Sequence, residues 1–214
     1  MLKKLLGVLG LAATVALTGC AGAPTVKISA NDLAQVHTVH VSKTVPLPAQ
    51  MSYQGPGQAI GMALGPIGAM MGAQSALSNG KEMSAVMEIN HIDLGAIARA
   101  EFIRSLQANA HINVVEDSMP ADGDISLQVL NYGLSQSQGF GTTLYPIISV
   151  NAKMTRAGGT VVWQYGDNIT PFNNRNDKGY NHDEYMKTPA LMGERFTVAS
   201  DIISDLLVAN LTGK

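Results

Sequence analysis

The stretch LYPIISVNAKMTRAGGTVVWQYGDNI, residues 144–169, decides the fold of this chain. Its two ends, residues 144–156 and 160–169, each predict a β-strand. The Ala-Gly-Gly between them, residues 157–159, is typical of a hairpin connection. These residues therefore predict two neighbouring strands, and the rest of the sheet is expected to form around them.

Further strands are predicted on the N-terminal side of this hairpin. Residues 125–136 predict a long strand, in which Ile125, Leu127 and Val129 alternate onto one face. Residues 111–116 predict a shorter strand. The Asp- and Gly-rich sequence between the two predicts a turn.

A still earlier strand is predicted from Thr38 to Val45. It places Val39, Val41 and Val45 on one side, and Pro46 ends it.

Two helices are predicted, one before and one after the strands at residues 111–169 along the chain. Apolar residues at helical spacing favour an amphipathic helix from Leu94 to Ala108, with Asp93 as its N-cap. Arg99 and Arg104 lie off the apolar stripe and are predicted to be solvated. A final helix is predicted from about Pro189 to Leu211, docked through a mostly apolar side; it follows a long polar loop at residues 171–189. Residues 81–90 fit either a helix or a strand.

This order of elements predicts an α+β fold. It consists of a mostly antiparallel sheet with helices packed on one face, plus a glycine-rich apolar helical insert at residues 55–80. The expected organisation is a signal peptide at residues 1–19, a tether at 20–34 and one domain at 35–214.

The N-terminus has the pattern of a targeting segment. Lys3 and Lys4 are followed by the apolar run Leu5–Leu17, which is too short to span a membrane comfortably. The residues Leu-Thr-Gly-Cys that end at Cys20 resemble the lipobox of bacterial lipoproteins. This resemblance implies cleavage before Cys20, a diacylglycerol on its sulfur and an acylated amino group. Ala21 then favours transfer to the outer membrane. The alternative is an ordinary secretory signal with a chance cysteine.

Cys20 is the only cysteine of the chain, so no disulfide can form within it and no cysteine cluster or cysteine nucleophile is available. The net charge is −2, and no basic patch indicates a nucleic-acid partner. Only 14% of the residues are charged, and none of these occurs from Val45 to Gly80.

The glycines of this uncharged stretch are regularly spaced. Gly57, Gly61 and Gly65 are four residues apart, and so are Gly68 and Gly72. On a helix this spacing aligns glycines along one side, where another backbone can approach closely. Each glycine costs about 1 kcal/mol in a helix relative to alanine. We therefore expect membrane contact or self-association to compensate for this cost.

The length of the stretch argues against a simple transmembrane span. From Ala59 to Ala73 a helix would measure roughly 22 Å, whereas the bilayer core is about 30 Å thick, and Pro66 would disturb the helix. Several arrangements remain open: short segments from several subunits, an interfacial hairpin, packing against the domain's own sheet, or an apolar loop.

Residues from about 93 to 211 resemble small α+β envelope lipoproteins. The likeness lies in a helix that leads into the strand INVVE, a long strand after an Asp/Gly turn, and a hairpin that ends in GGTVVW at Trp163. Auxiliary lipoproteins of envelope transporters, lipopolysaccharide-assembly lipoproteins and curli-secretion-like periplasmic domains share this style. The resemblance implies partner binding or assembly, and it carries over no functional residue.

No motif indicates an enzyme, a metal site or a cofactor. The sequence contains no Gly-x-Ser-x-Gly pattern and no phosphate-binding loop. His37 and His40 fall on opposite faces of a strand, and His182 and Asp183 are expected in a solvated loop. The aromatic residues Trp163, Tyr165, Tyr132 and Tyr145 could line a ligand groove, but such residues more often fill a sheet–helix core.

The sequence therefore predicts a lipoprotein anchored in the bacterial outer membrane through Cys20 and facing the periplasm. Its role is expected to be accessory or structural in an envelope assembly, with other envelope proteins or further copies of itself as partners. The alternative is a periplasmic binding module for lipid or a small apolar ligand.

Overall fold

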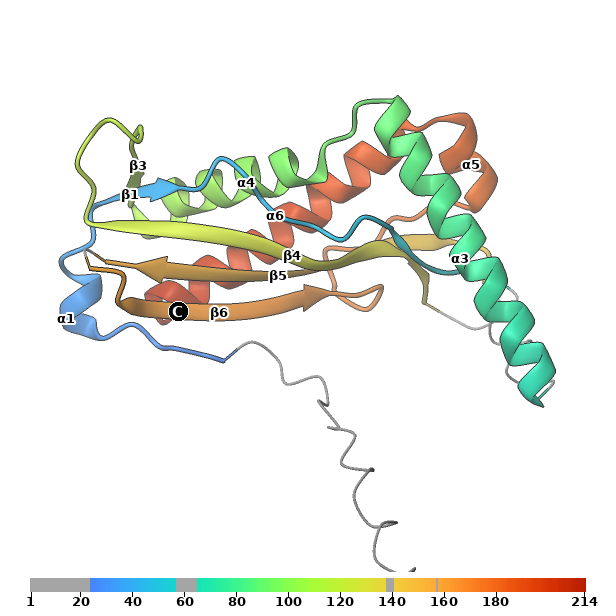
Figure 1. Cartoon of the computed structure of the whole chain (residues 1–214), viewed down its shortest axis with the longest axis horizontal. Helices are drawn as coiled ribbons and strands as arrows, with labels where there is room; N and C mark the ends of the chain where they lie inside the picture. The colour runs from blue at the N-terminus through green and yellow to red at the C-terminus, as the bar shows by residue number, and fades with distance from the viewer. Residues whose placement is uncertain (1–23, 57–64, 138–140, 157) are drawn as a thin grey trace, which may run out of the picture.

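A computed structural model describes residues 24–56, 65–137, 141–156 and 158–214 (Figure 1). In chain order its elements are α1 (Ala30–Leu33), β1 (Thr38–Val41), β2 (Ser52–Gln54), α3 (Gly65–Ile89), α4 (Leu94–Ser105), the π-helical turn η1 (Leu106–Ala110), β3 (Asn113–Val114), β4 (Gly123–Gln136), β5 (Leu144–Thr155), β6 (Val161–Ile169), α5 (His182–Lys187) and α6 (Ala190–Thr212). The predicted α+β class is confirmed.

The sheet is built on the three long strands that the sequence predicts. Its order is β3-β1-β4-β5-β6, and β2 pairs with β4 beyond the end of β1. The long ladders β4–β5 and β5–β6 are antiparallel, whereas β1 joins β3 and β4 in parallel and β2 joins β4 in parallel. The predicted strand at residues 111–116 shortens to β3, and β2 has no counterpart among the predicted elements.

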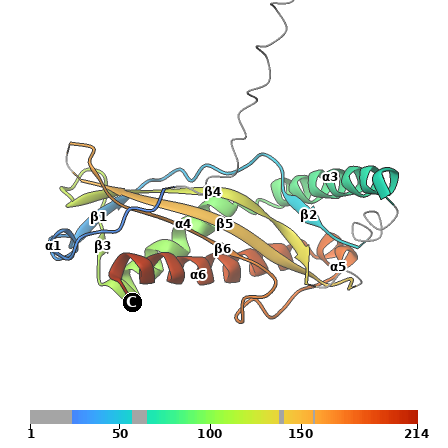
Figure 2. The same ribbon diagram turned by 90° about the horizontal axis from the view of Figure 1, so that it is seen from below.

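Helices α4 and α6 cover one face of the sheet (Figure 2). The strands alternate, and their apolar residues turn toward these helices. Leu127 and Val129 of β4, with Val150 and Ala152 of β5, are buried there. α6 contributes a row of buried apolar residues, namely Met192, Phe196, Ala199, Ile202, Ile203, Leu207, Val208 and Leu211. The core therefore lies between the sheet and its helical layer.

The start of α4 follows the predicted capping signal. The Asp93 carboxylate accepts a hydrogen bond of 3.0 Å from the N–H of Ala96, which satisfies one of the free donors of the first turn. The helix then widens into η1 and stops at His111, which adopts a left-handed conformation with φ of 56°. The chain can therefore turn directly into β3.

Residues 81–90, which fit a helix or a strand in sequence, belong almost entirely to α3. This helix begins inside the glycine-rich stretch at Gly65 and continues to Ile89. The predicted insert at residues 55–80 is therefore helical from Gly65 onward, and the same helix continues into the domain.

The predicted polar loop at residues 171–189 is wrong in its second half, where α5 forms. The Asn181 side chain accepts a hydrogen bond from the Glu184 N–H at 2.9 Å, and the Glu184 side chain accepts one from the Asn181 N–H at 2.8 Å. These two hydrogen bonds form a capping box. Tyr185 is fully buried, and its hydroxyl donates to the carbonyl oxygen of Leu144 at 3.1 Å. Burial of this one aromatic residue attaches an otherwise polar segment to the sheet.

The domain begins earlier than predicted, within the segment at residues 20–34 that is expected to be a tether. Val26 and Gln164 exchange two backbone hydrogen bonds of 2.8 Å, so the chain before α1 lies along the edge of β6. Ile28 and Leu33 pack against the core. The part of the predicted tether from Val26 onward is therefore fixed to the domain.

Candidate functional site

The second half of α3 is attached to the domain. Met83 and Met87 are buried, and the N–H of Met51 donates to Ser84 Oγ at 2.8 Å. Gly80 lies so close to the chain before β2 that a Cβ there would be 2.3 Å from the carbonyl oxygen of Met51. We call these contacts of Met51 with Gly80 and Ser84 the seam. The seam holds the helix in one orientation against β2.

The first half of α3, residues 65–77, projects beyond the ends of β4 and β5 in both views (Figures 1 and 2), and we call it the arm. Its side chains Met70, Met71 and Leu77 are 74%, 70% and 60% exposed. The arm carries no charged residue. Large apolar groups displayed together on an uncharged helix indicate a contact surface.

The arm contains three of the five glycines for which the sequence predicts a close-packing face, namely Gly65, Gly68 and Gly72. Gly57 and Gly61 lie outside the described residues. Among the helices of the described part of the chain, none combines the length and the hydropathy that crossing a bilayer requires. Membrane contact or self-association through these glycines stays a prediction.

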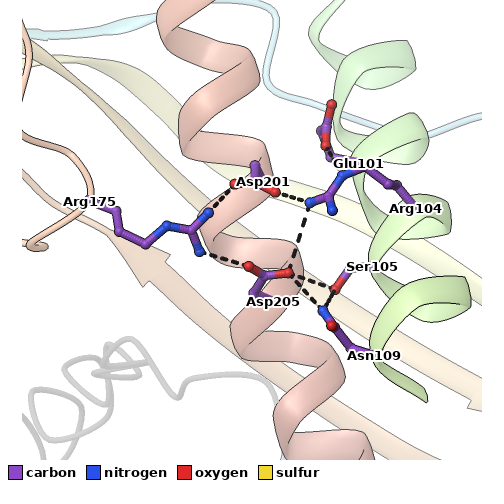
Figure 3. A network of polar contacts seen from close by, with 7 residues as sticks. All are labelled: Glu101, Arg104, Ser105, Asn109, Arg175, Asp201 and Asp205. Atoms are coloured by element: carbon purple, nitrogen blue, oxygen red, sulfur yellow. Dashed lines mark hydrogen bonds and ion pairs between the residues drawn. The ribbon is translucent and has the colours of Figure 1, made fainter.

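A second feature is a cluster of charges on the outer side of the helical layer (Figure 3). Asp201 and Asp205, one turn apart on α6, face Arg104 of α4 and Arg175 of the loop after β6. Both arginines contact Asp201, and Arg175 Nη1 lies 2.7 Å from Asp205 Oδ2. Arg104 is exposed, as predicted, and it also links two helices.

Polar side chains of α4 and η1 complete this cluster, which we call the carboxylate clasp. Asp205 accepts hydrogen bonds from Ser105 Oγ at 2.9 Å and from Asn109 Nδ2 at 3.1 Å. Arg104 Nε donates to Glu101 at 2.8 Å. The carboxylates of α6 are thus committed to neighbouring donors, so the clasp serves to hold α4, α6 and the loop together.

We expect Asp205→Ala to lower the free energy of unfolding by about 1–2 kcal/mol, because Ser105, Asn109 and Arg175 lose their shared acceptor. Urea denaturation measures this difference. Asp117→Ala is the matched control, since it removes an exposed pair with Lys43 and should lower the stability clearly less than Asp205→Ala does. Equal costs for the two variants would show that the clasp does not hold the helices.

A third feature is His40 of β1, which bridges β4 and the turn that precedes it. Its Nδ1 lies 2.8 Å from Asp124 Oδ1, and its Nε2 lies 2.8 Å from the carbonyl oxygen of Met119. Both partners are acceptors, so both ring nitrogens must carry a proton to satisfy them. The hydrogen bond to Asp124 and that to Met119 raise the pKa of His40 above its ordinary value.

This raised pKa predicts a pH dependence of stability. The charged form of His40 is favoured in the folded protein, so its contribution is full below about pH 6.5 and is lost as the pH rises through the raised pKa. We expect His40→Gln to remove this part of the pH dependence of the melting temperature. His37→Gln, three residues away and exposed, is the control. NMR titration of the His40 ring checks the pKa itself, and a value at or below 6.5 would contradict the prediction.

The histidines that the sequence singles out do not gather. His37 precedes β1, His40 is held by Asp124, and His182 lies in the first turn of α5 with its Nδ1 3.6 Å from Asp183. Within the described ranges, no three His, Asp or Glu side chains are placed to share a metal ion.

The aromatic residues divide between the core and the surface. Trp163 is fully buried on β6, and its indole N–H donates to Asn210 Oδ1 of α6 at 3.0 Å. Tyr132 is buried edge-on to Phe196. Tyr165 is half-buried, and its hydroxyl donates to Asp167. Tyr145 is half-buried on the face of β5 opposite to the buried Leu144. For Trp163 and Tyr132 the structure supports the core interpretation.

The chain matches no protein-family model and no curated protein. Among solved structures it is similar to a PelC dodecamer from Paraburkholderia phytofirmans, with 12% identity and a TM-score of 0.45 over 88% of this chain and 96% of that one. A putative lipoprotein from Caulobacter crescentus shares 16% identity over 56% of this chain and 82% of that chain, with a TM-score of 0.41.

A DUF330 protein from Xanthomonas campestris is also similar, with 16% identity and a TM-score of 0.39, and the match spans 56% of this chain and 63% of that protein. Other similar structures are titled a minor lipoprotein from Acinetobacter baumannii and a lipoprotein from Neisseria meningitidis. Similar structures are therefore named as bacterial lipoproteins, but the likeness is too distant to assign a role to any residue.

Proposed function

We propose that this chain is a lipoprotein anchored through Cys20 in the bacterial outer membrane, with a non-enzymatic accessory or structural role in an envelope assembly. The observation that carries the proposal is the arm, an uncharged helix with exposed Met70, Met71 and Leu77 that extends from the domain. The charged clusters of the domain, in contrast, make their contacts within the domain itself. The arm is the contact surface of the protein.

The anchor and the domain lie close together along the chain. Cys20 is outside the described residues, but Val26 is already paired with β6. The intervening chain reaches at most roughly 20 Å when fully extended. The domain would then stay near the membrane surface, and the arm would meet lipid or proteins of the same membrane.

The anchor is tested by growing cells with a labelled fatty acid and comparing the wild type with Cys20→Ser. We expect label and outer-membrane fractionation for the wild type, and neither for the variant, because one thiol carries the lipid. Crosslinking in intact cells then identifies the partners of the anchored protein. An unlabelled wild-type protein in the soluble fraction would overturn the proposal.

A second candidate, a binding module for lipid or a small apolar ligand, is favoured by one hollow. It lies between the segment at residues 47–50, the second half of α3 and the start of α4. Apolar residues such as Leu47, Met87 and Leu94 line it, and so do the charged residues Lys81, Glu88 and Asp93. Mass spectrometry of the purified Cys20→Ser form tests this candidate. A copurified lipid would support it, and a ligand-free protein would count against it.

A further inference from the structure

A hollow of about 540 Å³ lies on the open face of the sheet, opposite to α4 and α6, and we call it the sheet hollow. It is lined by His40 of β1, Ser126 of β4 and Lys153 of β5, among others. Each of these three residues alternates with buried neighbours along its strand, so its side chain points away from the core. The sheet hollow is therefore separate from the core and from the carboxylate clasp.

The sheet hollow is lined by three cationic side chains and by only two carboxylates. Lys43 Nζ lies 2.7 Å from Asp117 Oδ2. His40 Nδ1 lies 2.8 Å from Asp124 Oδ1. Each carboxylate therefore already has a cation beside it. Lys153 is half-buried, and it makes no ion pair with any residue that the structure describes. Its ammonium group remains available to an anion from outside the chain.

Neutral hydrogen-bond donors lie beside Lys153. In the antiparallel ladders, Lys153 is directly opposite Ser126 of β4 on one side and Gln164 of β6 on the other. Opposite residues on one face of a sheet have Cβ atoms about 5 Å apart. An ammonium, a hydroxyl and an amide thus present donors to the same patch of surface. Phosphate oxygens accept hydrogen bonds from all three groups, and the charged ammonium makes the strongest of these bonds.

The same row of the sheet leads to the predicted membrane anchor. Gln164 pairs with Val26 through two backbone hydrogen bonds, so Val26, Gln164, Lys153 and Ser126 follow one another across the sheet. Neighbouring strands are about 4.8 Å apart, which places Val26 roughly 10 Å from Lys153. Cys20 comes only a few residues before Val26. A lipid on Cys20 would therefore keep the sheet hollow within reach of the membrane surface, where lipid headgroups carry phosphate.

We propose that the sheet hollow binds the phosphate of an anionic lipid headgroup, with Lys153 as the charged contact and Ser126 as a hydroxyl donor. This inference rests on the proposed function, because the lipid on Cys20 is what holds the domain at the membrane. The open face of the sheet then lies toward the bilayer, and the helical layer with its carboxylate clasp faces away from it. The anchored domain thereby takes one orientation on the membrane.

The test uses the full, lipidated chain in phosphatidylcholine vesicles that contain a phosphatidylglycerol with a photoreactive headgroup. After illumination, mass spectrometry locates the attached lipid along the chain. We expect labelling at residues 124–126 and 153–155 in the wild type. Lys153→Gln should reduce this labelling roughly tenfold, because a charge-assisted hydrogen bond is lost. Lys153→Arg keeps the charge and should keep the label.

Lys187→Gln is the matched control, because Lys187 is an exposed lysine of α5, at the other end of the sheet from β1 (Figure 1). It removes the same charge and should leave the labelling unchanged. Unchanged melting of each variant shows that the domain remains folded. Flotation of the same vesicles reports the anchor and photolabelling reports the sheet hollow, so the two can fail independently.

Three results would overturn the proposal. The first is labelling of Lys153→Gln that equals that of the wild type. The second is an equal loss for Lys153→Gln and Lys187→Gln, which would mean that only the overall charge of the protein attracts the lipid. The third is loss of the label when excess inorganic phosphate is added, because the sheet hollow would then take free phosphate in preference to the headgroup.

Discussion

Trp163→Ala is expected to lower the free energy of unfolding by about 3–5 kcal/mol, which is the usual cost of truncating a large buried aromatic side chain. Trp163 is fully buried on β6, where its indole N–H reaches Asn210 of α6. The substitution leaves a cavity and also removes the donor to Asn210 Oδ1. Urea denaturation followed by circular dichroism measures the loss, since the variant has no tryptophan fluorescence.

Two control variants separate packing from hydrogen bonding. Trp163→Phe keeps most of the ring volume and loses the N–H, so we expect a cost of about 1–2 kcal/mol. Asn210→Ala removes only the acceptor and should cost a similar amount. A Trp163→Ala variant that unfolds within about 1 kcal/mol of the wild type would mean that the residue lines a surface groove.

The elements that the sequence predicts well are those whose signal is local. Alternation in residues 125–136 and the hairpin at residues 157–159 predict β4, β5 and β6, and the structure contains all three. Asp93 predicts the start of α4 because an N-cap acts on the next few backbone N–H groups. In each case the residues that decide the element lie within it or beside it.

The elements that sequence reasoning misses depend on distant contacts. β2 is short, and its place is set by pairing with β4 and by the seam with α3. α5 looks polar along the chain, and it is fixed by the buried contact of Tyr185 with Leu144. Local periodicity contains no information about a single anchoring side chain whose partner lies far away in sequence.

The candidate sites divide in the same way. The uncharged sequence of the arm is visible from composition alone, and so is the lone Cys20. The carboxylate clasp has a partial signal, because Asp201 and Asp205 are spaced to share one side of α6. Arg175 gives no such signal, since it comes from a loop whose position follows only from the whole fold. Arg104 is exposed as predicted, but its contact with Asp201 of α6 gives no local signal for the same reason.

Gly80→Ala is expected to lower the free energy of unfolding by about 1–3 kcal/mol, although alanine is the better helix former. The new Cβ would lie 2.3 Å from the carbonyl oxygen of Met51, which is a backbone atom and cannot rotate away. α3 must then shift, and the hydrogen bond from Met51 to Ser84 is strained. Urea denaturation measures the loss, and faster hydrogen exchange at the seam locates it.

Gly193→Ala is the matched control, and we expect it to change the free energy of unfolding in the opposite direction. Gly193 lies in α6, and a Cβ there would meet only the side chain of Ile92 at 3.8 Å, an ordinary contact. Alanine should therefore raise the free energy of unfolding by about 0.5–1 kcal/mol through helix propensity and the less flexible unfolded chain. If Gly80→Ala were stabilising as well, close approach to Met51 could not be the reason for glycine at position 80, and α3 would not be held at that point.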